Sequence, residues 1–143
     1  MGEDQLKMTG YCGLYCGDCV FKHGTINDLA QQLLDEFTNA RLDKIVEVIP
    51  FIDEEKYKQT HEFLESIVPL RCTGCREDMR SKFCDVANCA REKEIEGCWG
   101  CAEFSACSKM EFLAHVHGDA HIKNLEKIKD IGLEEWIEGG PLW

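Results

Sequence analysis

Two short cysteine pairs have the spacing of metal-binding loops. They are Cys72-Thr73-Gly74-Cys75 and Cys98-Trp99-Gly100-Cys101. In a C-x-G-C loop two thiolates approach one cation from neighbouring positions, and the glycine permits a tight turn that aims backbone N–H groups at the sulfur atoms. The two pairs together fit the C-x₂-C…C-x₂-C zinc pattern to within a residue or two. We therefore expect Cys72, Cys75, Cys98 and Cys101 to be metal ligands.

A second group of thiols lies near the start of the chain, in the block Cys12–Cys19. On a helix, Cys12, Cys16 and Cys19 would share one face through their i,i+4 and i,i+3 spacing, and in a loop the glycines between them would permit the same convergence. Zinc held by three thiolates needs a fourth ligand. That ligand comes from a later cysteine in a structural site, or from water in a catalytic site.

The later block, residues 72–107, holds seven of the ten cysteines, including Cys84 and Cys89. Residues 81–95 read as a helix, on which a five-residue step leaves these two side chains roughly 140° apart. One alternative is that the helix begins or breaks between them and Cys72, Cys75, Cys84 and Cys89 form a local site. The other is that the two C-x-G-C pairs combine, while Cys84, Cys89 or Cys107 completes the site of the first block. The spacing leaves both open.

Ten thiols exceed the eight that two four-cysteine zinc sites use, so histidine assistance is worth considering. His117 and His121 have the i,i+4 spacing that can chelate from one helical face, but Gly118 lies between them. We favour solvated histidines on a surface helix for His115, His117 and His121, and we leave ligation by His23, His117 or His121 open. His61 lies among helix residues and is expected to be partly buried and hydrogen-bonded.

Composition indicates the compartment and excludes some partners. Sixteen Lys and Arg against 27 Asp and Glu give a net charge of −11, which argues against nucleic acid, because phosphate backbones are bound by basic surfaces. The first residues contain no apolar run of the kind an export signal needs, and no stretch of about 20 apolar residues predicts a membrane span. We expect a cytoplasmic protein, where dense cysteines indicate metal or redox chemistry rather than disulfides.

The elements that must position these thiols are helices. Apolar residues recur at helical spacing between Thr25 and Pro69, and we expect three helices in segment 25–69: one begun by a Thr25–Asp28 capping box, one ended by Pro50, and one beginning near Asp53. Residues 108–138 should form the C-terminal helices, with a Ser108–Glu111 capping box and a stop at Gly132. The predicted fold is mainly α, a single helical domain over 1–143 with cysteine-rich zinc-knuckle loops.

The order and spacing of all ten cysteines resemble the small cysteine-rich family known as domain of unknown function 3795. The residues that carry this likeness are Cys12-Gly13-Leu14-Tyr15-Cys16-Gly17-Asp18-Cys19, Cys72-Thr73-Gly74-Cys75, Cys84, Cys89-Ala90-Arg91-Glu92-Lys93, and Cys98-Trp99-Gly100-Cys101-Ala102-Glu103-Phe104 followed by Cys107. The likeness covers nearly the whole chain. It implies a zinc-binding protein of bacteria or archaea, often anaerobic ones, and no established reaction.

No catalytic signature is legible in the sequence: we find no G-x-S-x-G, no P-loop and no G-x-G-x-x-G. The interpretation we favour is a structural-zinc interaction module, binding two zinc ions and recognising a protein partner. The alternatives are an iron–sulfur or thiol redox protein, and a hydrolytic enzyme if one zinc keeps an open position. All ten cysteines are candidate ligands: Cys12, Cys16, Cys19, Cys72, Cys75, Cys84, Cys89, Cys98, Cys101 and Cys107.

Overall fold

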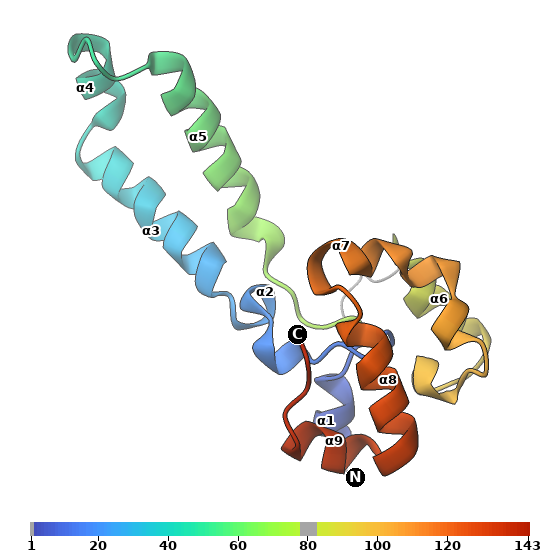
Figure 1. Cartoon of the computed structure of the whole chain (residues 1–143). Coiled ribbons are helices and arrows are strands. Elements are labelled where there is room, and N and C mark those ends of the chain that lie inside the picture. Colours follow the sequence, from blue (N-terminus) through green and yellow to red (C-terminus); the bar gives the residue numbers. More distant parts are fainter. Residues whose placement is uncertain (1, 78–82) are drawn as a thin grey trace. The chain divides into compact units, whose positions relative to one another are not determined.

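The computed structural model describes residues 2–77 and 83–143, and it confirms the mainly helical fold class (Figure 1). No strand occurs in these ranges; the nearest feature is one isolated antiparallel bridge between Thr9 and Tyr15. Contacts within the chain fall into two compact units. Unit 1 comprises residues 1–22 and 73–143, and unit 2 comprises residues 23–72. The one domain over 1–143 that the sequence predicts stays a prediction.

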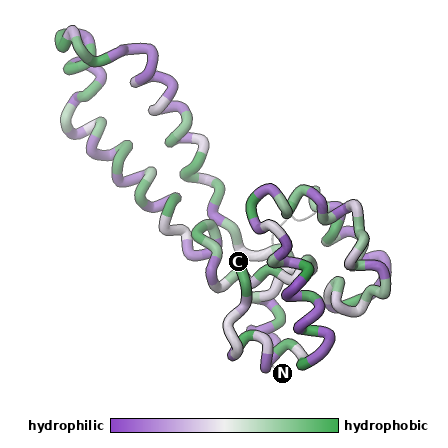
Figure 2. Tube along the Cα trace, viewed as in Figure 1, coloured by the Kyte–Doolittle hydropathy of each residue, from purple (hydrophilic) through white to green (hydrophobic). Residues whose placement is uncertain are grey.

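Unit 2 is built from three helices, α3 (Thr25–Asn39), α4 (Leu42–Val48) and α5 (Glu54–Ile67), followed by the 3₁₀ turn η2 (Val68–Leu70). Helices α3 and α5 run side by side (Figure 1). Apolar and polar residues alternate along both, as Figure 2 shows, and the apolar positions Ala30 and Leu34 of α3 are buried. The three helices expected in segment 25–69 are thereby confirmed.

The N-terminal caps of α3 and α5 were predicted with different success. Helix α5 is capped as its sequence suggests, because the Asp53 carboxylate accepts a hydrogen bond from the Lys56 backbone N–H at 3.1 Å. The Thr25–Asp28 capping box is wrong. The N-cap of α3 is Gly24, whose φ of 77° lies in the left-handed region, and Asp28 instead pairs with Arg71.

Unit 1 carries nine of the ten cysteines and is built mostly from short elements. They are α1 (Glu3–Lys7), η1 (Cys16–Asp18), α2 (Val20–His23), α6 (Asp85–Glu92), η4 (Cys98–Gly100), η5 (Phe104–Ala106), η6 (Ser108–Leu113), α7 (Ala114–His117), α8 (Ala120–Ile131) and α9 (Leu133–Glu138). Its longest helix, α8, ends at Gly132, as predicted. The predicted Ser108–Glu111 capping box is wrong, because the turn η6 begins after Cys107 and has no side-chain cap.

The core of unit 1 has two adjoining parts. The first consists of Val86, Cys98, Phe104, Met110, Leu113 and Leu125, and the second of Ile128, Leu133 and Trp136. Trp136 is fully buried; its indole N–H donates to the Asn124 side chain at 3.2 Å, and Tyr15 packs edge-on against its ring at 6.1 Å between centroids. No helix in the described ranges has the length and apolar character needed to cross a membrane.

Candidate metal centre

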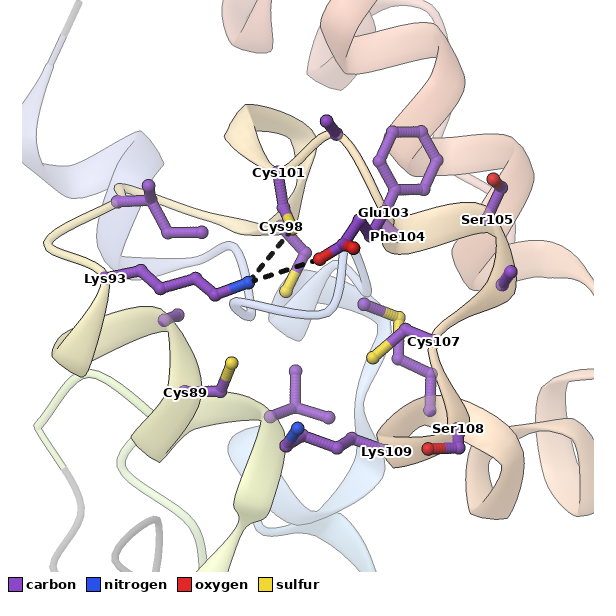
Figure 3. Close-up of a pocket in the computed structure, with 16 residues that line it drawn as sticks. Cys89, Lys93, Cys98, Cys101, Glu103, Phe104, Ser105, Cys107, Ser108 and Lys109 are labelled. Carbon is purple, nitrogen blue, oxygen red and sulfur yellow. Dashed lines mark hydrogen bonds and ion pairs between the residues drawn. The ribbon is translucent and has the colours of Figure 1, made fainter.

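Four cysteines line one cavity of about 490 Å³ in unit 1. Cys89 lies on α6, Cys98 opens η4 and Cys101 follows it, and Cys107 directly follows η5. In Figure 3 their sulfur atoms turn toward the cavity from three sides. Neither arrangement inferred from the cysteine spacing contains this group of four, which we call the first thiol set.

Backbone hydrogen bonds of short 3₁₀ turns hold three of these thiols in place. The N–H of Cys101 donates to the carbonyl of Cys98 at 3.0 Å, and the N–H of Cys107 donates to the carbonyl of Phe104 at 3.2 Å. The side chain of Phe104 is buried in the core, which anchors the turn before Cys107. Cys89 is presented by α6, whose buried residues Val86 and Ala90 line the same cavity.

The glycine of each C-x-G-C pair was expected to permit a tight turn. The structure supports this for Gly74 but not for Gly100. Gly74 has a φ of 106°, a conformation that favours glycine. Gly100 does not have a positive φ, and a Cβ atom there would lie 3.8 Å from Ile95, an ordinary contact. The turn at Cys98–Cys101 therefore does not require its glycine.

A lysine lies beside the first thiol set. The ammonium Nζ of Lys93 is 3.5 Å from the Cys101 sulfur and 3.9 Å from a Glu103 carboxylate oxygen (Figure 3). The hydrogen bond to Cys101 is the main reason that the pKa of Lys93 is raised. Sequence reasoning missed this residue, although Lys93 follows Cys89 by four positions, a spacing that places two side chains on the same face of a helix.

Burial affects the protonation of Cys98. Cys98 is the one cysteine of the ten that is buried rather than partly exposed, and its pKa is raised to about 12, first by burial and then by the neighbouring sulfurs of Cys107, Cys101 and Cys89. Burial favours the neutral thiol, and the positive charge of Lys93 offsets this effect only in part. A bound divalent cation would reverse this preference, because metal ligation deprotonates the thiol outright.

The donor set fits a soft or borderline metal ion. Four sulfur ligands are typical of structural zinc and of iron–sulfur clusters. In the described ranges no three His, Cys, Asp or Glu side chains are gathered closely enough to hold an ion as they stand. Binding at the cavity would therefore require the four thiols to draw inward, which the open space between them permits.

The remaining cysteines lie in several places. Cys12 and Cys84 pack against the first part of the unit 1 core, and the Cys75 carbonyl accepts a hydrogen bond from Arg91 at 2.9 Å. Cys84 directly precedes α6, so the predicted helix over 81–95 is corrected to Asp85–Glu92; residues 81 and 82 lie outside the described ranges. Cys16 opens η1 and Cys19 follows it, and Cys72 belongs to unit 2.

The histidines differ from the expected solvated set. His115 is exposed, but His121 on α8 is only 4% exposed, so its assignment to a solvated surface is wrong. The Nδ1 atoms of His117 and His121 are buried and have no hydrogen-bond partner. His61 is partly buried beside Phe37 and Tyr57 and pairs with Glu65, as expected. His23 ends α2.

Comparison with known proteins identifies the family. Residues 8–112, well over half of the chain, match the family model described as protein of unknown function DUF3795. The chain belongs to the DUF3795 family. The matched range includes all ten cysteines of this DUF3795 protein, and so the whole of the first thiol set. No curated protein and no solved structure matches the chain.

Proposed function

We propose that this DUF3795 protein binds zinc through Cys89, Cys98, Cys101 and Cys107. The observation that carries the proposal is that four thiols from separate short elements line one cavity. Four thiolates around one ion are the usual ligand set of structural zinc. Lys93 supports the same assignment, since its positive charge offsets part of the negative charge that a zinc ion with four thiolates carries.

The zinc proposed here has a structural role. The segment from Cys98 to Leu113 consists of three consecutive 3₁₀ turns, none longer than six residues. Such turns have poor hydrogen-bond geometry and little stability of their own. A metal ion that links Cys98, Cys101 and Cys107 to helix α6 would supply the missing cross-links, and its binding free energy would be folding free energy.

We place this module in the cytoplasm, where a reducing environment keeps thiols available for zinc. Its role there is to present a metal-ordered surface to another protein. This interpretation uses the acidic net charge of −11, which disfavours nucleic acid as the partner.

A second candidate, an iron–sulfur cluster on the same four cysteines, is favoured by one observation. The cavity of about 490 Å³ is larger than a single ion needs. A hydrogen bond to a ligand sulfur, such as that from Lys93 to Cys101, is also one of the features that set cluster potentials. A cluster would colour the protein brown, whereas zinc is colourless.

Metal analysis of protein purified without oxygen tests both candidates. We expect zinc, no visible absorbance, and at least a tenfold weaker affinity for one ion in the Cys107→Ser variant. The matched control is Ser105→Ala, because Ser105 lines the same cavity and offers no sulfur. Iron with broad absorbance near about 400 nm would replace the zinc proposal by the cluster. Wild-type protein that binds neither metal would refute both.

A further inference from the structure

A second group of sulfur atoms converges beside Gly10. A Cβ atom built on Gly10 would lie 3.4 Å from the Cys12 sulfur and 3.8 Å from the Cys75 sulfur, so both sulfur atoms flank the same small space. The Gly10 N–H donates to the Leu14 carbonyl at 2.8 Å, which closes the turn carrying Cys12. A side chain at position 10 would fill the space between the two thiols, and glycine leaves it open.

Cys84, at the N-cap of α6, is a further cysteine near Cys12. Cys12 and Cys84 both pack against the core part that contains Val86 and Cys98. The sulfurs whose charge would act on a Cys12 thiolate are those of Cys75, Cys84 and Cys98. Cys12, Cys75 and Cys84 come from three segments of unit 1 and neighbour one another, and we call them the second thiol set. In the described ranges they are not gathered closely enough to hold an ion as they stand, so binding there too would require the thiols to draw inward.

Cys98 lies between the two sets. Its backbone N–H donates to the Tyr11 carbonyl at 2.9 Å, which holds it next to Cys12. Its side chain also lines the cavity of the first thiol set. Without Cys98, each set has three cysteines, which is one ligand fewer than the four that tetrahedral zinc needs. A thiolate sulfur has enough lone pairs to bind two cations, so a single shared Cys98 would complete both.

We propose that Cys12, Cys75 and Cys84 form a second metal site, and that the Cys98 thiolate bridges its ion to the ion of the first thiol set. This proposal rests on the proposed zinc site. Two divalent cations would bind seven thiolates, and the seven thiols would release their protons to solvent. The resulting centre has a net negative charge.

Positive side chains lie near the cysteines of both sets. Arg91 donates to the Cys75 carbonyl at 2.9 Å, and Arg76 donates to the Thr9 carbonyl at 2.9 Å. The guanidinium groups of Arg76 and Arg91 both lie over the Tyr11 ring, at 4.3 and 5.3 Å from its centroid. With Lys93 beside Cys101, three cations lie on the cysteine-bearing segments in a chain that is acidic overall. Such outer-shell cations stabilise a thiolate-rich centre.

Zinc titration of metal-free full-length protein, followed by counting of bound ions, tests the second site. We expect two ions per wild-type chain. Cys84→Ser should lose the ion of the second thiol set and keep that of the first. Cys107→Ser should lose the ion of the first thiol set and keep that of the second. Cys98→Ser should weaken both sites at least tenfold. Ser105→Ala serves as the control and should bind two ions.

Cadmium substitution tests the bridge in the unaltered protein, so it does not depend on a variant that folds. Two ¹¹³Cd nuclei joined by one sulfur show scalar coupling to each other, and we expect that coupling in the wild type. Two uncoupled resonances would overturn the bridge. One bound ion that Cys107→Ser removes and Cys84→Ser retains would overturn the second site and leave the proposed function standing. No bound ion at all would refute the proposed function itself.

Discussion

The backbone N–H of Cys98 donates to the carbonyl oxygen of Tyr11, with 2.9 Å between the two atoms. This hydrogen bond joins the first cysteine block to the second one, although a whole helical unit separates them in sequence. It is independent of any metal. The backbone alone therefore holds the residue before Cys12 against Cys98, without help from a metal ligand.

Metal removal should loosen unit 1 before unit 2. We expect chelation to abolish amide-exchange protection over η4, η5 and η6, because these turns are only three to six residues long and short 3₁₀ turns have little stability of their own. Protection should persist over α3 and α5, whose packing buries Ala30 and Leu34. Hydrogen exchange with and without chelator measures this difference, and reloading with zinc is the control. Equal protection in both states would mean that the thiols are not structural ligands.

Two glycines of the cysteine-bearing turns should respond differently to alanine. Gly13 has a φ of 85°, and a Cβ there would lie 2.8 Å from the Leu125 side chain. We expect Gly13→Ala to lower the free energy of unfolding by about 1–3 kcal/mol through backbone strain and overpacking. Gly100→Ala is the matched control and should change it by less than about 0.5 kcal/mol. Chemical denaturation measures both, and equal effects would contradict the packing described around Gly13.

Asn124 holds the end of the chain against α9. Its side-chain oxygen accepts from the indole N–H of Trp136 at 3.2 Å and from the Leu142 N–H at 3.0 Å, and its amide donates to the Leu142 carbonyl at 2.7 Å. Asn124→Ala would leave buried donors unpaired, so we expect a loss of about 1–3 kcal/mol in unfolding free energy. The exposed Asn39→Ala is the control for thermal unfolding. Equal stability of the two variants would contradict this role.

Stability should fall in mild acid because of His121. Burial, followed by the nearby His117, lowers the pKa of His121, while Asp119 acts weakly in the opposite direction. The folded protein therefore binds this proton less readily than the unfolded chain, and unfolding free energy should decrease as the pH falls below about 6.5. His121→Gln should flatten that dependence, and the exposed His115→Gln should not. Denaturation curves recorded between pH 5 and 8 measure this dependence, provided that the unfolding free energies are precise to about 0.5 kcal/mol.

The helical elements were predictable because their signals are local. The apolar spacing of Leu29, Leu33 and Leu34 and the carboxylate of Asp53 act within one or two turns, and the structure contains the corresponding helices. Capping boxes at Thr25 and Ser108 were wrong because a glycine or a cysteine before each helix takes the N-cap position without any side-chain hydrogen bond.

The grouping of the thiols could not be predicted, because it depends on contacts between residues far apart in the sequence. Cysteine spacing reports on neighbours within a loop, whereas Cys89 meets Cys98 and Cys107 through the packing of Val86, Phe104 and Met110. Likewise, Cys12 reaches Cys75 and Cys98 through hydrogen bonds between segments distant in the chain. His121 was misplaced because its helix buries the face on which it lies, and the periodicity of Leu125 and Ile128 already indicated that face.

The edge-on contact between Tyr15 and Trp136 gives the protein a built-in optical probe. An indole shielded entirely from water fluoresces at shorter wavelength than an exposed one, and its emission shifts when water reaches it. Tyr15 lies inside the first cysteine block, so movement of that block alters the surroundings of Trp136. With Trp99 and Trp143 replaced by phenylalanine, the fluorescence wavelength of Trp136 would report in real time whether the first cysteine block is ordered, with no attached dye.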